Sequence, residues 1–125
     1  MKVLVVNDSG LVGERLLEQL GGLEGLTLLP QAFNAIQASL MLRTEAPDLV
    51  LLDPLLPAGT SLGLLREIRT RVPDAKVIIL SAATDAVQQR AWLDSGADDC
   101  ITFATDVREL LGRMRNGGRP APSRA

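Results

Sequence analysis

Three short segments of the chain are unbroken apolar runs that end on polar side chains. A run of this kind has no alternation between apolar and polar positions, so it predicts a strand that is covered on both faces. Parallel sheets flanked by helices contain such strands. The three runs, each with the polar residues that follow it, are 3–6 before Asn7 and Asp8, 49–52 before Asp53, and 77–80 before Ser81.

The segments between these runs have the apolar spacing and the capping residues of helices. Two further strands complete the pattern. Residues 26–33 contain Pro30, which belongs on an edge strand, and residues 100–103 form a short fifth strand. We expect helix caps at Ser9, Asn34, Ser61, Thr84 and Asp106, with the last helix ending near Arg115.

This alternation of strand and helix predicts the α/β class. We expect a single doubly wound (βα)5 domain, in which a five-stranded parallel sheet has right-handed crossovers and helices on both faces. The chain has 125 residues, enough for one domain with its own core, and we expect that domain over residues 1–116. Residues 117–125 are rich in Gly, Pro, Ser and Arg, so we expect a disordered tail or a truncated linker there.

The amino-acid composition excludes several classes of function. A formal net charge of -2, with one tryptophan and two phenylalanines, provides neither the basic field nor the stacking surfaces that nucleic-acid binding uses. The chain has no histidine, which excludes Ser-His and Cys-His catalysis and histidine-based zinc sites. The single cysteine, the strand-like start at Met1 and the lack of a membrane-spanning apolar stretch lead us to expect a cytoplasmic protein without membrane contact.

The polar residues at the strand ends suggest a site that binds a metal ion and receives a phosphoryl group. Asp8 and Asp53 follow runs that we expect to be neighbouring strands, so their carboxylates should meet at the edge where such folds bind ligands. Two carboxylates without histidine or thiolate suit hydrated Mg²⁺ better than a Ca²⁺ cage. A metal-bound carboxylate beside the hydroxyl of Ser81 can receive a phosphoryl group. The plainer alternative for Asp53 is a solvated carboxylate that ends a strand.

Four segments together resemble the response-regulator receiver domain of two-component signalling, over residues 2–115. Each segment is weak alone, and their combination is specific. The segments are VLVVNDS at 3–9, PDLVLLD at 47–53 with Pro57 four residues later, VIILSA at 77–82 and LDSGADD at 93–99. The resemblance implies a flavodoxin-like sheet of order 2-1-3-4-5. It also implies that the phosphoryl donor is a phosphohistidine on a histidine kinase or a phosphotransfer protein.

By position, the resemblance implies a role for each polar residue at this edge. Asp53 resembles the phospho-acceptor, and Ser81 resembles the hydroxyl that hydrogen-bonds the phosphoryl group. Mg²⁺ would be held by Asp8, Asp53 and the backbone carbonyl of Leu55, with Asn7 reaching it through water. Autodephosphorylation usually follows, so we expect a signalling domain and not an enzyme. The face formed by helix 4, strand 5 and helix 5 is expected to bind a downstream protein or a second copy.

Three family positions are altered together, and we expect them to make the domain atypical. Asn7 stands where the family commonly has an acid, Phe103 where a lysine contacts the phosphoryl group, and Cys100 where an aromatic side chain switches. The switch positions are therefore Ser81, Cys100 and Phe103. We expect weakened Mg²⁺ binding and slower phosphorylation. One missing charge-assisted hydrogen bond of about 1.5 to 3 kcal/mol corresponds to roughly a ten- to hundredfold loss of rate.

We also make predictions about the position of the Phe103 side chain and about the peptide bond that follows it. Alternation along the fifth strand points its side chain where the family's lysine points, so we expect the benzyl group to border or fill the phosphoryl pocket. The residue after it is Ala104 and not the proline of the family, so we expect a trans bond between Phe103 and Ala104 and a displaced loop.

Other functions compete with phosphorylation. The main alternative is a pseudo-receiver, a phosphorylation-independent interaction or dimerisation module, which we rank second because Asp8, Asp53 and Ser81 all persist. A flavodoxin-like nucleotide-binding enzyme ranks third, since the chain has neither a Walker phosphate loop nor a dinucleotide glycine motif. Trp92 has polar neighbours, and the sequence leaves it open between an exposed anchor for a partner and a lid on the core.

Overall fold

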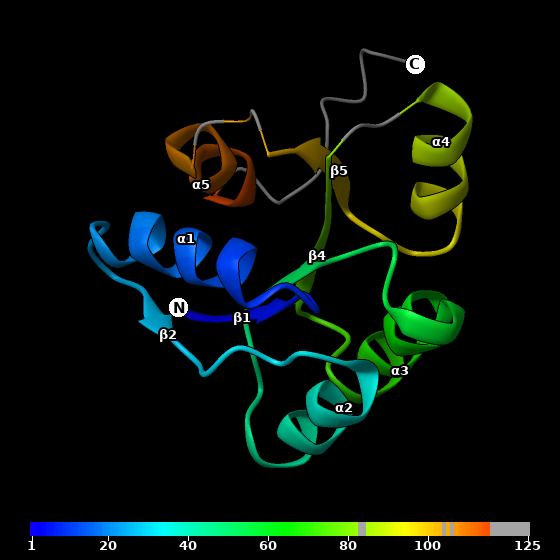
Figure 1. Ribbon diagram of the computed structural model, residues 1–125, viewed down its shortest axis with the longest axis horizontal. Coiled ribbons are helices and arrows are strands. Elements are labelled where there is room, and N and C mark those ends of the chain that lie inside the picture. The colour runs from blue at the N-terminus through cyan, green and yellow to red at the C-terminus, as the bar shows by residue number, and fades with distance from the viewer. Residues whose placement is uncertain (83–84, 104, 106, 116–125) are drawn as a thin grey trace.

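The structure is a computed structural model that describes residues 1–82, 85–103, 105 and 107–115. Strands and helices alternate along the whole of this range (Figure 1). They are β1 (Lys2–Val6), α1 (Gly10–Gly21), β2 (Thr27–Leu28), α2 (Ala35–Thr44), β3 (Leu49–Leu52), the 3-10 turn η1 (Pro57–Gly59), α3 (Ser61–Arg71), β4 (Lys76–Ser81), α4 (Ala86–Asp94), β5 (Asp99–Thr102) and α5 (Val107–Arg115). The predicted tail at 117–125 lies outside the described residues.

The strands form one parallel sheet in the order β2-β1-β3-β4-β5, so the predicted fold class and strand order are confirmed. In this sheet Val6 of β1 pairs with Leu52 of β3, and Leu52 pairs with Ile79 of β4. The residues that follow these positions therefore emerge at one edge of the sheet. The strand β2 is at the margin of the sheet, which agrees with the predicted edge position, but it covers only Thr27–Leu28 of the expected 26–33 and ends two residues before Pro30.

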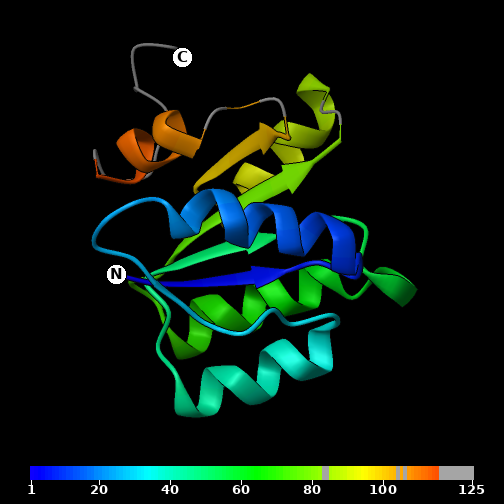
Figure 2. The ribbon, with the colours of Figure 1, turned by 60° about the vertical axis from the view of Figure 1, so that its left-hand side comes forward.

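Helices cover both faces of the sheet, and each face has its own core. Figure 2 shows α1 on one side of the sheet and α2 and α3 on the other. Leu16 and Leu20 of α1 and Leu110 of α5 pack on the first face. Residues of α2 and α3 pack on the second face, with Trp92 of α4 partly buried against the same cluster. Because both faces are covered, the central strands are buried and apolar over the runs 3–6, 49–52 and 77–80, as the sequence predicted.

Side-chain caps open three of the helices. Ser9 accepts a hydrogen bond from the Val12 amide at 3.2 Å, and Asn34 accepts one from the Gln37 amide at 2.8 Å, so both predicted caps are confirmed. The cap of α4 is Asp85, and the predicted caps Thr84 and Asp106 lie outside the described residues. None of the helices in the described part of the chain combines the length and apolar character needed to cross a membrane.

A buried ion pair closes the amino-terminal edge of the sheet. The carboxylate of Asp98, which is 4% exposed, binds the guanidinium of Arg69 and accepts the Val77 amide at 2.8 Å. Arg69 also donates to the carbonyl oxygens of Gly96 at 2.7 Å and Ala75 at 2.5 Å. One side chain of α3 therefore holds the segments that precede β4 and β5.

Candidate functional site

Polar residues from three strands meet at the carboxyl edge of the sheet. Asp53 directly follows β3, Asp8 lies two residues beyond β1, and Ser81 is the last residue of β4. The pairing of β3 with both β1 and β4 brings these three residues to one side of the domain. The sequence analysis predicted this convergence, and parallel α/β sheets bind their ligands at this edge.

The carboxyl group of Asp53 is half-buried and lies beside that of Asp8. Burial is the main reason that its pKa is raised. The backbone amide of Leu55, which donates to Oδ1 of Asp53 at 2.8 Å, opposes the increase. The charge of Asp8 and a hydrogen bond between the two carboxyl groups raise the pKa of Asp53 further. A proton or a cation between the two groups relieves this repulsion.

Ser61 holds the loop that follows Asp53. Its hydroxyl is buried, donates to the carbonyl oxygen of Asp53 at 2.7 Å and accepts the Leu56 amide at 3.1 Å. The predicted role of Ser61 as a helix cap is therefore wrong, because Thr60 precedes α3 and makes no side-chain cap. The sequence cannot show whether a serine hydroxyl caps a helix or hydrogen-bonds the preceding loop, because the two cases differ only in the path of that loop.

The residue before Asp8 has its side chain engaged in a local turn. Asn7 is 5% exposed, and its Oδ1 accepts the Ser9 amide at 2.8 Å. The backbone amide of Asn7 donates to the carbonyl oxygen of Ala32 at 3.0 Å. The oxygen that was predicted to reach a metal through water thus has one hydrogen bond within the chain. That role for Asn7 stays a prediction.

The end of β5 brings an apolar side chain to the neighbourhood of Ser81. The Phe103 amide donates to the Ser81 carbonyl oxygen at 3.1 Å, so the two backbones are side by side. The Phe103 side chain is 43% exposed and carries no charge. Its expected place bordering or filling the phosphoryl pocket stays a prediction, and its bond to Ala104 involves a residue outside the described ranges.

A pocket of about 600 Å³ opens beside Ser81, between the loop after β3 and helix α4. Trp92 forms part of its wall and is partly buried against the core, which agrees with a lid on the core. Its role as an anchor for a partner stays a prediction. The described residues that line this pocket are uncharged. They are Pro54, Leu55, Leu62, Ser81, Ala82, Gln88, Ala91, Trp92 and Ser95.

Cys100, at the predicted aromatic switch position, is partly buried behind α4. Its Sγ lies 3.9 Å from the carbonyl oxygen of Gln89. Burial, followed by the charge of Asp99, raises the pKa of the Cys100 thiol to about 11. The side chain is therefore a neutral, packed thiol at neutral pH. Its role as a switch position stays a prediction.

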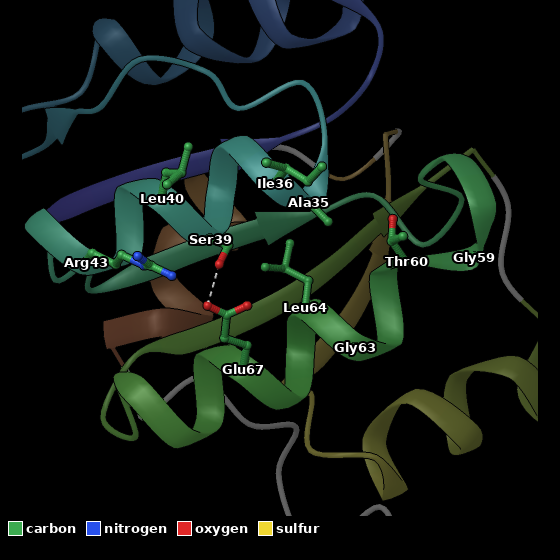
Figure 3. Close-up of a pocket in the computed structure, with 10 residues that line it drawn as sticks. All are labelled: Ala35, Ile36, Ser39, Leu40, Arg43, Gly59, Thr60, Gly63, Leu64 and Glu67. Atoms are coloured by element: carbon green, nitrogen blue, oxygen red, sulfur yellow. Dashed lines mark hydrogen bonds between the residues drawn. The ribbon is translucent and has the colours of Figure 1, made fainter.

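A separate pocket of about 450 Å³ lies between α2 and α3 (Figure 3). Ser39 of α2 donates a hydrogen bond of 2.6 Å to Glu67 of α3 and so joins the two helices across it. The described lining contains none of Asp8, Asp53 and Ser81. This pocket is therefore distinct from the candidate site at the strand ends.

The donor atoms at the carboxyl edge fit a hard cation. Asp8 and Asp53 offer carboxylate oxygens, and the Leu55 amide already donates to one oxygen of Asp53. The role of the Leu55 carbonyl as a metal ligand stays a prediction. In the described part of the chain no group of three or more His, Cys, Asp or Glu residues could hold a metal. Two carboxylates with room for water suit Mg²⁺, which keeps several waters in proteins. They supply less charge than a site with three acids.

A sequence model described as "Response regulator receiver domain" matches residues 3–115. The chain belongs to this family. Receiver domains act in two-component signalling, and phosphorylation on an aspartate is their general function. This receiver domain is similar to the response regulator MprA of Mycobacterium ulcerans, with 32% identity over 115 residues that cover 92% of this chain and 49% of that protein. The chain spans about half the length of the curated relatives it matches.

Solved structures have the same fold. The receiver domain of Francisella response regulator 1452 has a TM-score of 0.79 and 26% identity, covering 94% of this chain and 95% of that one. A response regulator from Burkholderia pseudomallei, with a phosphorylated aspartic acid, a calcium ion and citrate, has a TM-score of 0.83 and 20% identity. That match covers 94% of this receiver domain and 68% of the other chain, and it supports the fold alone.

Proposed function

We propose that this receiver domain accepts a phosphoryl group on Asp53 from a phosphohistidine of a histidine kinase or a phosphotransfer protein. The observation that carries the proposal is the pairing of the half-buried Asp53 carboxyl with that of Asp8, at the edge where Ser81 ends the next strand. A nucleophile, a partner for a cation and a hydroxyl donor are the groups that phosphoryl transfer to a carboxylate needs.

In the proposed step a carboxylate oxygen of Asp53 attacks phosphorus. A P–O bond to Asp53 forms, the P–N bond to the donor imidazole breaks, and the imidazole keeps the electron pair. Asp8, Asp53 and the Leu55 carbonyl would hold Mg²⁺, which neutralises charge on the transferred group when bound. The Ser81 hydroxyl donates to a phosphoryl oxygen. Attack of water on the phosphorus of the acyl phosphate then breaks the P–O bond to Asp53, releases inorganic phosphate and restores the carboxylate, so the domain undergoes autodephosphorylation and turns over no separate substrate.

We propose that this transfer is slower than in a receiver domain with the full set of family residues. Asn7 carries no charge where an acid is common, and its Oδ1 accepts the Ser9 amide. Phe103 offers a benzyl group and no cationic donor at the end of β5. One missing charge-assisted hydrogen bond corresponds to roughly a ten- to hundredfold lower rate.

The partners form part of the same proposal. The face of α4, β5 and α5 would bind a downstream protein or a second copy, and Val87 of α4 is 80% exposed. Direct nucleic-acid binding by this domain is not part of the proposal, because its net charge is -2. We propose a cytoplasmic location, as predicted from the single cysteine, and a domain boundary near residue 116.

Mass spectrometry of the intact protein tests the proposal. Incubation with Mg²⁺ and acetyl phosphate should add one phosphoryl group to the parent protein and none to Asp53→Asn. Peptide mapping after borohydride trapping should locate the modification on Asp53. An adduct of equal yield on Asp53→Asn would contradict the assignment of the acceptor.

The altered positions favour a second candidate function. Phe103 and Cys100 replace a cation and an aromatic side chain that the family uses, and such losses suit a pseudo-receiver that binds its partner without phosphorylation. The absence of any adduct with acetyl phosphate and with a phosphorylated phosphotransfer protein would favour this candidate over the first.

A further inference from the structure

The side chain of Gln31 spans from the segment after β2 to the loop that carries Asp8. Its Nε2 donates to the carbonyl oxygen of Asn7 at 2.8 Å and to that of Ser9 at 3.1 Å. These carbonyl groups lie on the two sides of Asp8. One amide group therefore holds the peptide unit that precedes Asp8 and the one that follows Ser9, so it spans the Asp8 segment.

The backbone beside Gln31 is itself anchored to β1. Ala32 pairs with Val6, its amide donates to the Val5 carbonyl oxygen at 3.0 Å, and its carbonyl oxygen accepts the Asn7 amide at 3.0 Å. The Gln31 side chain thus extends from a fixed point of the sheet. The Asp8 loop, which has left the β1 ladder, receives from it the support that the ladder no longer provides.

Helix α1 leaves room for this side chain at one position. Gly13 is buried in the second turn of α1, and a Cβ atom there would lie 1.9 Å from Oε1 of Gln31. Glycine is unfavourable in the middle of a helix compared with alanine. Here it has a structural reason, because any larger residue would displace the Gln31 amide from the carbonyls of Asn7 and Ser9.

We infer that Gln31 is a positioning residue for Asp8, and that Gly13, which has no Cβ, leaves the space that the Gln31 amide occupies. The inference rests on the proposed function, in which Asp8 binds Mg²⁺. A neutral amide suits this place because it satisfies two carbonyl oxygens and adds no charge beside the Asp8 and Asp53 pair. Residues that orient metal ligands typically change metal affinity 10- to 100-fold when they are removed.

The direct test is calorimetric titration of the unphosphorylated protein with Mg²⁺. Gln31→Ala should bind Mg²⁺ about 10- to 100-fold more weakly than the parent. Gln37→Ala is the matched control, since the Gln37 side chain also hydrogen-bonds a backbone group, here by accepting the Phe33 amide at 2.8 Å, but Gln37 is exposed on α2. It should leave the Mg²⁺ affinity unchanged. Equal affinities of Gln31→Ala and the parent would overturn the inference.

A double-mutant comparison separates positioning from general stability. A Cβ atom at position 13 would push the flexible Gln31 amide off the carbonyls of Asn7 and Ser9, so Gly13→Ala should weaken Mg²⁺ binding as Gln31→Ala does. Combining the two substitutions should cause no further loss of affinity, because both act through the same amide, and the unfolding temperature of each variant is measured alongside. If the two losses add, or if the Mg²⁺ affinity follows the unfolding temperature, Gln31 has only a structural role and the inference is wrong.

Failure of the inference can be told apart from failure of the proposed function. A parent protein that binds Mg²⁺ and gains a phosphoryl group on Asp53, with Gln31→Ala unchanged in both, refutes only the role of Gln31. A parent protein that shows neither Mg²⁺ binding nor an adduct refutes the proposed function and the inference together.

Discussion

The guanidinium of Arg69 and the carboxylate of Asp98 form an ion pair at the sheet edge opposite Asp53, with the Asp98 side chain 5% exposed and that of Arg69 24% exposed. The same carboxylate oxygen accepts the Val77 amide. The Asp98 carboxylate is thus removed from water and the Arg69 guanidinium largely so, and each also binds backbone groups. The pair fixes α3 to the starts of β4 and β5, so loss of either side chain breaks a charge pair that is mostly buried.

We predict that Asp98→Ala lowers the free energy of unfolding by about 3 to 5 kcal/mol, because breaking a buried pair leaves an uncompensated charge. Asp98→Asn retains an acceptor for the Val77 amide and should lose less. Asp94→Ala is the control: Asp94 lies 3.9 Å from Arg90 in an exposed pair, and its removal should change stability by less than about 1 kcal/mol. Urea unfolding of the three variants measures this, and similar losses in all three would contradict the prediction.

Asp53→Asn should be more stable than the parent protein at pH 7. The raised pKa of Asp53 means that its ionised form is less favourable in the folded state than in the unfolded chain. The parent therefore loses stability as pH rises from the ordinary carboxyl pKa through the raised one, and the asparagine variant does not. Unfolding temperatures between pH 4 and pH 8 should show a difference that grows with pH, and that Mg²⁺ reduces. A difference that shrinks with rising pH would refute the assigned direction.

Phe103→Lys should raise the rate of Asp53 phosphorylation by acetyl phosphate, by up to roughly ten- to hundredfold. The expected gain comes from one charge-assisted hydrogen bond to the phosphoryl group at the end of β5. Phe33→Lys is a matched control, since Phe33 is also 43% exposed but precedes α2. Initial rates at equal Mg²⁺ decide the matter, and an unchanged rate in Phe103→Lys would point to Asn7 or the loop after β5 as the limiting feature.

The Cys100 thiol should resist alkylation in the folded protein. Its pKa of about 11 leaves roughly a hundredfold less thiolate near pH 8.5 than a thiol with the ordinary pKa of about 8.5. Iodoacetamide labelling followed by mass spectrometry should therefore be slow in buffer and fast in guanidinium chloride. In the folded protein the labelling rate should rise nearly tenfold between pH 9 and pH 10, because the thiol is far below its pKa. A rise of less than about 1.5-fold over the same range would show a thiol with the ordinary pKa.

The sequence predicted the sheet and the convergence of its polar ends because both depend on local patterns. Apolar runs without alternation identify buried strands, and the residue after each run must emerge at the carboxyl edge. Asp8, Asp53 and Ser81 could therefore be named before any coordinates, although their roles are proposals. The adjacency of β1 and β3 was expected from the runs that end on Asp8 and Asp53, and the full strand order followed from the family resemblance.

Contacts between distant side chains could not be predicted in this way. Arg69 and Asp98 are 29 positions apart, and Gln31 lies 24 positions from Asn7, so neither contact leaves a periodic trace in the sequence. Ser61 was assigned to the wrong partner because its hydroxyl can serve a helix start or the preceding loop equally well. Gly13 is explained only once the position of the Gln31 amide is known.

Trp92 gives this domain a built-in optical reporter. It is the only tryptophan of a chain that has no tyrosine, so ultraviolet emission excited near 295 nm comes from this one indole. The indole forms part of the pocket wall that also includes Ser81. Any rearrangement of that wall changes the polarity around a single fluorophore, so stopped-flow emission can follow events at Ser81 in unlabelled protein.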